Sequence, residues 1–173
     1  MSNYKKLLLS VKTFIFDVDG VMTDGIVILS PDGDILRTMN VKDGYALQLA
    51  VKKGYQIIII TGGRSELVRA RFTNLGIEHI HLGINNKHEL FEQLVEDLKL
   101  DKSNILYMGD DIPDYNIMKE VGIPTCPADA VEEVKKISKY ISYYNGGKGC
   151  VRDVIEQVMK VQKTWFDDDS FLW

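Results

Sequence analysis

Two aspartates follow the first apolar run of the chain. Residues 11–16 are mostly apolar, and Asp17 and Asp19 come directly after them in the stretch FDVDGVMTDG. A carboxylate can attack phosphorus and form an aspartyl-phosphate. A second carboxyl group nearby can protonate the leaving oxygen and then activate water. These residue types indicate phosphoryl transfer, with one aspartate as the nucleophile and the other as acid and base.

Other polar residues follow later apolar runs. Thr61 ends the run QIIIIT, Asp110 and Asp111 follow NILYMG, and Lys87 opens a helical pattern. Several carboxylates together repel one another unless some are protonated or a cation neutralises them. Mg²⁺ suits such a site because it prefers oxygen ligands and substrate phosphate. Thr61 and Lys87 are donors suited to phosphoryl oxygens, so the sequence predicts a Mg²⁺-dependent site.

Alternating apolar runs and helical patterns must position these residues. They predict an α/β fold, a mostly parallel sheet with helices on both faces, in which ligands bind at the carboxyl ends of the strands. Between Gly25 and Val41, two extended runs flank SPDGD, which predicts a β-hairpin inserted after the first strand. The predicted strands are 11–16, 56–61, 104–109 and 123–126, with a short one near 79–82. The predicted helices are 44–53, 65–75, 87–98, 130–139 and 151–161.

The bulk composition narrows the class of protein. The chain has 173 residues, 45% of them apolar, and a net charge of −4. We expect one domain over residues 1–162, followed by a tail at 163–173. The mild acidity gives no case for nucleic acid as a partner, and no stretch has transmembrane length. Two distant cysteines, Cys126 and Cys150, favour a reducing, cytoplasmic location.

Four segments together resemble a known family. In order and spacing they are similar to the four motifs of the haloacid dehalogenase-like phosphatases, which have a three-layer Rossmann-like fold. The segments are FDVDGVMTDG, ITGG, Lys87 and GDDIPD. The resemblance implies Asp17 as nucleophile, Asp19 as general acid and base, and Thr61 and Lys87 as phosphoryl-holding residues. It also implies Mg²⁺ on Asp17, Asp110 and the backbone carbonyl of Asp19. Asp111 and Asp114 would be supporting residues or lesser ligands.

Three further features resemble a narrower branch of this family, whose members lack a large cap domain. These features are the early hairpin and the segments NVKDGYAL and GGKGCVRDV. This branch contains the 3-deoxy-D-manno-octulosonate 8-phosphate phosphatases, so the resemblance implies a sugar acid phosphate as substrate and a role in lipopolysaccharide synthesis. It also implies a homotetramer in which the hairpins pack together, and a glycine-rich C-terminal segment that can cover the site. Gly63 stands where relatives often have arginine or glutamate. The candidate substrate-binding residues are Gly62, Lys42, Arg64, Arg71, Lys148 and Arg152.

Several alternatives stay open at the level of sequence. The substrate could instead be a nine-carbon keto-deoxy sugar acid 9-phosphate. A phospho-accepting receiver module also uses acidic residues, a threonine and a lysine, and an inactive assembly subunit would keep the fold alone. Asp114 could serve the first turn of a helix or support the metal site. The segment at Gly146–Gly149 could be a lid or a plain loop.

Overall fold

The computed structural model describes residues 4–31, 33 and 35–171 of the chain. Within them lies a six-stranded sheet in the order β5-β4-β1-β6-β7-β8, and every neighbouring pair is parallel. This confirms the predicted α/β fold. The strands are β1 (Thr13–Phe16), β4 (Gln56–Ile60), β5 (His79–His81), β6 (Ile105–Met108), β7 (Ile123–Cys126) and β8 (Tyr140–Ile141).

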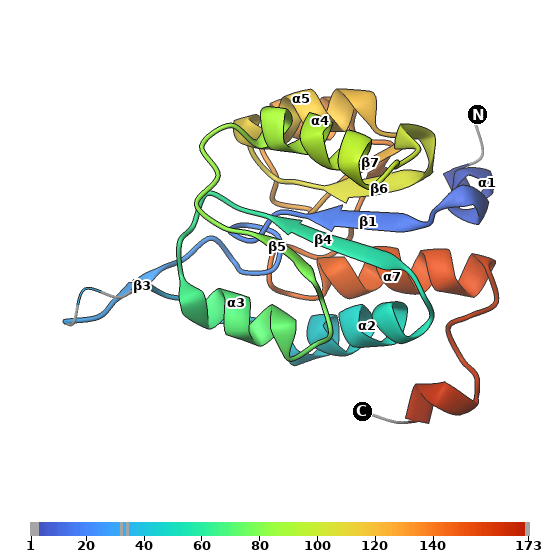
Figure 1. Ribbon diagram of the computed structural model, residues 1–173, viewed down its shortest axis with the longest axis horizontal. Coiled ribbons are helices and arrows are strands. Elements are labelled where there is room, and N and C mark those ends of the chain that lie inside the picture. The colour runs from blue at the N-terminus through green and yellow to red at the C-terminus, as the bar shows by residue number, and fades with distance from the viewer. Residues whose placement is uncertain (1–3, 32, 34, 172–173) are drawn as a thin grey trace.

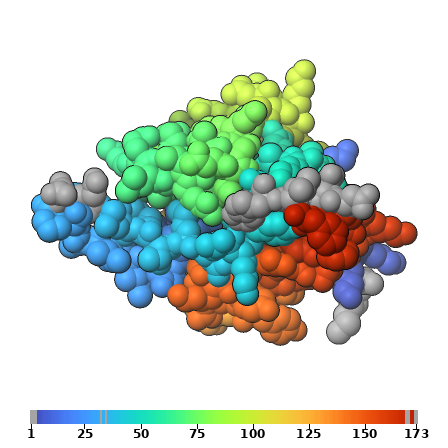
Figure 2. Space-filling model, turned by 90° about the horizontal axis from the view of Figure 1, so that it is seen from below, coloured from blue at the N-terminus to red at the C-terminus, as the bar shows by residue number. Residues whose placement is uncertain are grey.

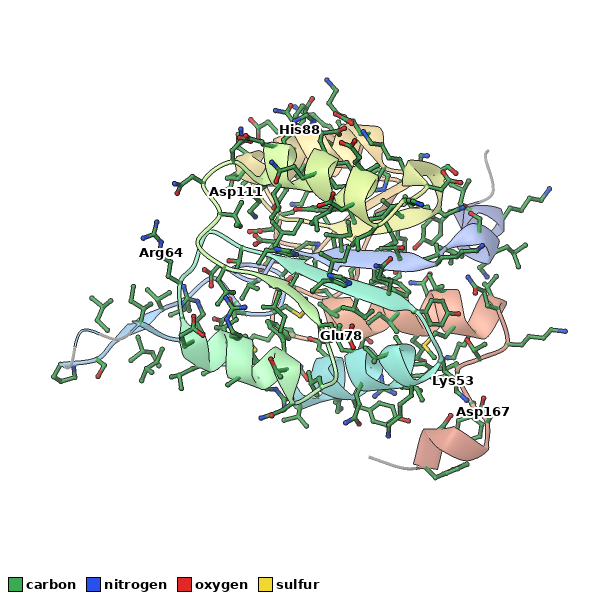
Figure 3. The ribbon with its side chains drawn as sticks, in the orientation of Figure 1. Lys53, Arg64, Glu78, His88, Asp111 and Asp167 are labelled. Carbon is green, nitrogen blue, oxygen red and sulfur yellow. The ribbon has the colours of Figure 1, made fainter. Side chains whose placement is uncertain are left out.

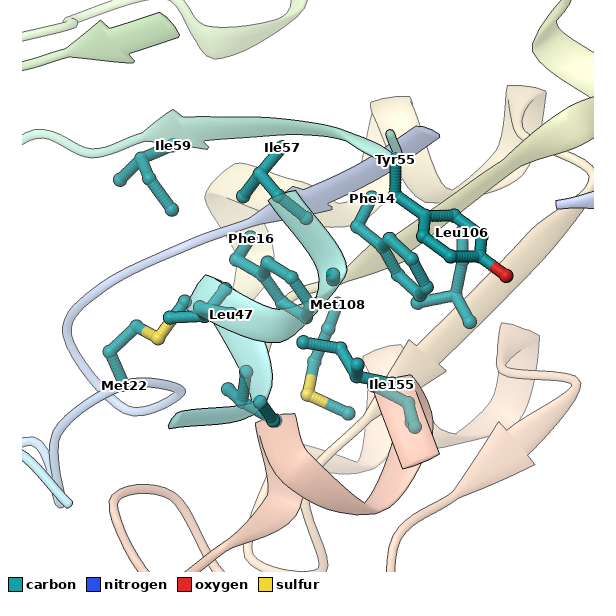
Figure 4. Packing of buried hydrophobic residues seen from close by; sticks show 14 of the residues in the cluster. Phe14, Phe16, Met22, Leu47, Tyr55, Ile57, Ile59, Leu106, Met108 and Ile155 are labelled. Atoms are coloured by element: carbon teal, nitrogen blue, oxygen red, sulfur yellow. The ribbon is translucent and has the colours of Figure 1, made fainter. Parts of the chain in front are cut away.

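The central strands are apolar on both faces because both faces are covered. In β1, Phe14 and Phe16 pack toward one helical layer, while Ile15 packs into the other. Phe14 and Phe16 lie among residues of β4, β6 and two helices (Figure 4). No side chain of β1 or β6 is exposed, so these strands form a firm base for the residues that follow them.

Helices lie on both sides of the sheet (Figure 1). One layer holds α2 (Val41–Lys52), α3 (Glu66–Thr73) and α7 (Cys150–Val161), and the other holds α4 (Lys87–Asp97), α5 (Tyr115–Glu120) and α6 (Glu132–Ile137). Helix α2 begins three residues before the predicted start because the Asn40 side chain accepts a hydrogen bond from the Lys42 amide. Among the described residues, no helix is long and apolar enough to span a membrane. The short helices are α1 (Tyr4–Leu7), η1 (Leu8–Ser10), η2 (Lys102–Asn104), η3 (Ile112–Asp114) and η4 (Asp168–Phe171).

The predicted hairpin is present between β1 and α2, and no cap domain is inserted there. Its strands β2 (Ile28–Leu29) and β3 (Ile35–Leu36) pair antiparallel, and it projects away from the body (Figures 1 and 2). Two residues of the predicted turn, 32 and 34, lie outside the described residues. The aliphatic side chains on this arm are at least 38% exposed: Ile26, Val27, Ile28, Leu29, Ile35 and Leu36.

The last described residues pack against α2 and α7. Trp165 is only 8% exposed, and its ring lies edge-on to Tyr45 and 5.1 Å from the guanidinium of Arg152. Lys53, the residue directly after α2, forms an ion pair with Asp167 at 2.6 Å (Figure 3). The described part of the tail is therefore attached to the body of the protein.

Candidate active site

Three carboxylates meet at the carboxyl edge of the sheet. Asp17 follows β1 directly, and Asp110 and Asp114 follow the adjacent strand β6. One oxygen of each lies within 4.8 Å of the others. The backbone amide of Asp17 still bonds to the Met108 carbonyl at 3.1 Å, so the pairing of β1 with β6 extends to the site. The structure thus places Asp17 close to Asp110, as expected for residues that follow two adjacent parallel strands.

Lys87 lies between two of these carboxylates. It is the first residue of α4, and its Nζ is 2.9 Å from Asp17 Oδ1 and 2.8 Å from Asp114 Oδ1. Burial opposes the charged form of Lys87, but the two carboxylates outweigh burial and raise its pKa. The ammonium is therefore fixed beside Asp17.

One ammonium does not balance the three carboxylates. Burial raises the pKa of Asp17, and the neighbouring Asp114 raises it further, against the opposing effect of Lys87. Burial also raises the pKa of Asp110 to about 8, with Asp17 and Asp114 adding to the effect. Asp110 Oδ1 is buried and has no hydrogen-bond partner among the described residues. An orphaned carboxylate oxygen in an acidic cluster is the environment that a divalent cation would complete.

Asp114 is completely buried, and donors engage both of its oxygens. Oδ1 accepts hydrogen bonds from Lys87 Nζ and from the Tyr107 hydroxyl at 2.6 Å, and Oδ2 accepts one from the Asp110 amide at 3.2 Å. Its side chain makes no capping hydrogen bond to α5. The geometry therefore favours the site-supporting role over the helix-start role.

Tyr107 is a site residue that sequence reasoning missed. It lies in the middle of β6, fully buried, with its hydroxyl bonded to Asp114. The available signal was a hydroxyl-bearing residue in a strand that is otherwise apolar, three residues before Asp110.

The close approach of these carboxylates requires glycine in the loop after β1. Gly20 has a φ of +89°, which favours glycine. A Cβ at Gly20 would also collide with the carboxylate of Asp110. Any larger residue there would separate the β1 loop from Asp110.

Thr61 lies at the end of β4, next to β1. It is 2% exposed, and its Oγ1 accepts a hydrogen bond from the Gly63 amide at 3.1 Å. Its own O–H remains available as a donor among the described residues. A threonine held in this way can present its hydroxyl hydrogen to an anion at the strand edge.

Asp19 lies outside the three-carboxylate cluster and pairs with a residue that sequence reasoning missed. Arg37, just after β3, contacts both of its oxygens: Nε lies 2.6 Å from Oδ1 and Nη2 lies 2.9 Å from Oδ2. No local sequence pattern identifies Arg37, because only the return of the hairpin toward the site brings it there.

The predicted substrate-binding residues line three different cavities. Gly62 and Arg64 line one of about 700 Å³ beside the hairpin, where the labelled Arg64 side chain points outward (Figure 3). Arg71 lines a narrower one of about 240 Å³ between the hairpin and α3. A third cavity, of about 890 Å³, is lined by Lys42, Lys148 and Arg152.

Asp111 and Arg152 have structural partners of their own. Asp111 is exposed, and its side chain accepts a hydrogen bond from the Ile112 amide at 2.7 Å. Arg152 lies over the rings of Tyr45 and Trp165, and its Nε bonds to Glu156 at 3.0 Å.

The glycine-rich segment packs against the β1 loop of its own chain. The Gly147 amide bonds to the Val21 carbonyl at 2.9 Å, and a Cβ at Gly146 would collide with the Gly20 carbonyl. Lys148 reaches Asp24 at 3.2 Å. In this arrangement the segment braces the loop that carries Asp17 and Asp19.

Comparison with known proteins points to one family. Residues 77–155 match the haloacid dehalogenase-like hydrolases. The 3-deoxy-D-manno-octulosonate 8-phosphate phosphatase of Salmonella typhi is 35% identical over 88% of this chain and 81% of its own length. The crystal structure of the Yersinia pestis phosphatase of this name superposes with a TM-score of 0.91, at 31% identity over 94% of this chain and 88% of that one.

A second solved structure carries ligands. The phosphatase of the same name from Moraxella catarrhalis was crystallised in complex with a magnesium ion, a phosphate ion and a KDO molecule. It superposes with a TM-score of 0.90, at 34% identity over 94% of both chains.

Proposed function

The chain belongs to the 3-deoxy-D-manno-octulosonate 8-phosphate phosphatases, within the haloacid dehalogenase-like hydrolases, and we propose that it is a Mg²⁺-dependent phosphatase acting on that eight-carbon sugar acid phosphate. The observation that carries the proposal is the buried contact of Lys87 with Asp17 at 2.9 Å, beside the unpartnered oxygen of Asp110. This arrangement places a candidate nucleophile, its counter-charge and a candidate metal ligand together at the carboxyl edge of the sheet.

The first half of the reaction transfers the phosphoryl group to the protein. A carboxylate oxygen of Asp17 attacks phosphorus, and the bond from phosphorus to the sugar oxygen breaks. Asp19 gives a proton to the departing oxygen, which leaves as the sugar hydroxyl. Thr61 and Lys87 donate hydrogen bonds to the phosphoryl oxygens and hold them in line with the attack.

The second half returns Asp17 to its starting state. Asp19, now ionised, takes a proton from water, and the water oxygen attacks the phosphorus of the aspartyl-phosphate. The bond between phosphorus and Asp17 breaks, and inorganic phosphate leaves. Lys87 stays paired with Asp114 throughout and keeps its position beside the changing charge on Asp17.

The acidic cluster is suited to hold the cation. Asp17 and Asp110 would supply carboxylate oxygens, and Asp19 would add its backbone carbonyl, while Asp114 supports them through Lys87 and the Asp110 amide. When bound, Mg²⁺ neutralises these carboxylates and draws charge from the phosphoryl oxygens.

We also propose a homotetramer in the cytoplasm. The exposed aliphatic side chains of the hairpin arm, at residues 26–29 and 35–36, form a surface that assembly would bury. Both cysteines are buried free thiols, which suits a reducing compartment.

The test is phosphate release from a panel of phosphates, with and without Mg²⁺. The panel compares the eight-carbon and nine-carbon sugar acid phosphates with simple hexose phosphates. We expect Mg²⁺-dependent preference for the eight-carbon acid. Preference for the nine-carbon acid would keep the mechanism and change the substrate. Single, stoichiometric phosphorylation without turnover would instead support a receiver module.

A further inference from the structure

Arg37 pairs with Asp19, the residue expected to serve as general acid and base. Its Nε and Nη2 bond to the two different oxygens of Asp19, at 2.6 and 2.9 Å, and its side chain is 8% exposed. Such a two-point pair of guanidinium and carboxylate is among the stronger side-chain contacts. While both oxygens accept from Arg37, this two-point contact fixes the orientation of the Asp19 carboxylate, so the group must turn before it can face the oxygen that leaves with the sugar.

The guanidinium still has donors to offer. It carries five N–H groups. Two of them bond to Asp19, and one on Nη1 bonds to the Ile35 carbonyl at 3.0 Å. Among the described residues, the other two have no acceptor. Arg37 also lines the cavity of about 700 Å³ that opens beside Gly62 and Arg64. It can therefore meet an anion that enters this cavity.

Gly63 provides the room for this arrangement. A Cβ at Gly63 would lie 3.0 Å from Arg37 Nη2, 3.4 Å from Asp19 Oδ2 and 3.5 Å from Thr61 Oγ1. Its φ is not positive, so the backbone there accepts other residues and the constraint is one of space. A side chain at position 63 would press on the ion pair between Arg37 and Asp19.

We propose that Arg37 is the specificity-determining residue that recognises the substrate's carboxylate and thereby releases Asp19. A carboxylate entering the cavity matches the planar fork of the guanidinium. It takes the donors that Asp19 held, and the released Asp19 takes up a proton from solvent and turns to the leaving oxygen, to which it gives that proton. Phosphate esters without a carboxylate cannot make this exchange. The inference rests on the proposed function, since it assumes an acid-bearing substrate.

The experiment compares two substrates in the full-length protein with Mg²⁺. One is the eight-carbon sugar acid phosphate, and the other is p-nitrophenyl phosphate, which has no carboxylate and a leaving group that needs no proton. For Arg37→Ala we expect KM for the sugar acid phosphate to rise roughly 10- to 100-fold. The kcat/KM for p-nitrophenyl phosphate should stay unchanged or rise. Arg37→Lys, which keeps the charge without the fork, should fall between. Arg69→Ala is the matched control, because Arg69 pairs with Glu66 on α3 and does not contact Asp19.

A second variant tests the role of Gly63. Gly63→Ala should reproduce the rise in KM, and in combination with Arg37→Ala it should add little, because both changes disturb one contact. Equal losses on both substrates would show a merely structural role for Arg37 and overturn the proposal. So would an unchanged KM for the sugar acid phosphate.

Failure of the proposed function has a different signature. The wild type would then hydrolyse p-nitrophenyl phosphate but none of the sugar acid phosphates. The free sugar acid would in that case be tested as an inhibitor of p-nitrophenyl phosphate hydrolysis. Weaker inhibition of Arg37→Ala than of the wild type would support the role of Arg37, and equal inhibition of both would overturn it.

Discussion

The ammonium of Lys87 lies 2.8 Å from the carboxylate of Asp114, a residue with no exposed surface. This contact makes Asp114 the anchor of the lysine that faces the nucleophile. Asp114 also accepts from Tyr107 and from the Asp110 amide, so one side chain aligns parts of α4 and the β6 loop.

Replacing Asp114 should therefore lower both stability and activity. In Asp114→Asn, the side-chain NH₂ group replaces one acceptor oxygen, so at least one group that donates to Asp114 loses its acceptor. Lys87 also loses a buried counter-charge. We expect a loss of about 3–5 kcal/mol in the free energy of unfolding. Tyr107→Phe is the matched control, since it removes one hydroxyl and should cost about 1 kcal/mol. Urea unfolding measures both, and equal costs would contradict the anchoring role.

The nucleophile can be tested by a nearly isosteric change. Asp17→Asn should lower kcat at least ~1000-fold, because an amide does not form the aspartyl-phosphate. Its fold should persist, since Lys87 retains Asp114. Phosphate release and circular dichroism check the two expectations. Ordinary turnover by this variant would remove Asp17 from the mechanism.

Metal binding depends on Asp110 in our assignment. Asp110→Ala should raise the Mg²⁺ concentration for half-maximal activity at least ~10-fold. Asp111→Ala is a suitable comparison, because Asp111 is exposed and its side chain bonds to the Ile112 amide. A Mg²⁺ titration that is the same for wild type and Asp110→Ala would exclude Asp110 from the ligand set.

The main site was predictable from the sequence for a geometric reason. Parallel strands end at one edge, so buried runs ending at Asp17, Thr61 and Asp110 had to bring these residues together. Arg37 and Tyr107 were not predictable in the same way. The returning strand of the hairpin places Arg37 beside Asp19, far from the other site residues in sequence. Tyr107 lies inside a buried strand, where its sequence position indicates only a core residue.

Some secondary structure could not be predicted from the hydrophobic pattern of the sequence either. Strand β8 contains only Tyr140 and Ile141, neither of them fully buried, so it has no apolar run to identify it. Helix α6 covers Glu132–Ile137, within the predicted 130–139, because only Val134 is buried and the apolar stripe is short. Tertiary pairing with β7 defines β8 instead.

The acidic cluster should make stability depend on pH in the metal-free protein. The pKa of Asp110 is raised from its ordinary 3.8 to about 8, and that of Asp17 is raised as well. Between pH 3.8 and about pH 8 the folded state therefore binds more protons than the unfolded state, so the free energy of unfolding falls as the pH rises. Lys87, paired with Asp17 and Asp114, limits this fall.

Calorimetry with a chelator and with Mg²⁺ measures this dependence. We expect the metal-free Tm to fall by roughly 3 °C per pH unit between pH 6 and 8. The gain from Mg²⁺ should be larger at pH 8 than at pH 6, because fewer protons must then be displaced. A Mg²⁺ gain that is constant over this range would count against protonated carboxylates in the metal-free site.

The exposed arm gives a prediction about assembly. Ile28 and Leu29 are 54% and 75% exposed on a two-stranded hairpin, and such a surface is unfavourable in water unless a partner covers it. We expect Leu29→Asp to lower the molecular mass in solution from that of the proposed tetramer toward that of a monomer. Leu9→Asp is the control, since Leu9 is 61% exposed on η1, away from the arm.

Light scattering after gel filtration measures the mass of each variant. Arg37 lies at the base of the same arm and contacts Asp19, so the proposed assembly through the arm would act on the active site as well. If neighbouring copies hold the arm in place, Leu29→Asp should also raise KM for the sugar acid phosphate. A wild type that is monomeric at micromolar concentration, or a Leu29→Asp variant of unchanged mass, would refute assembly through this surface.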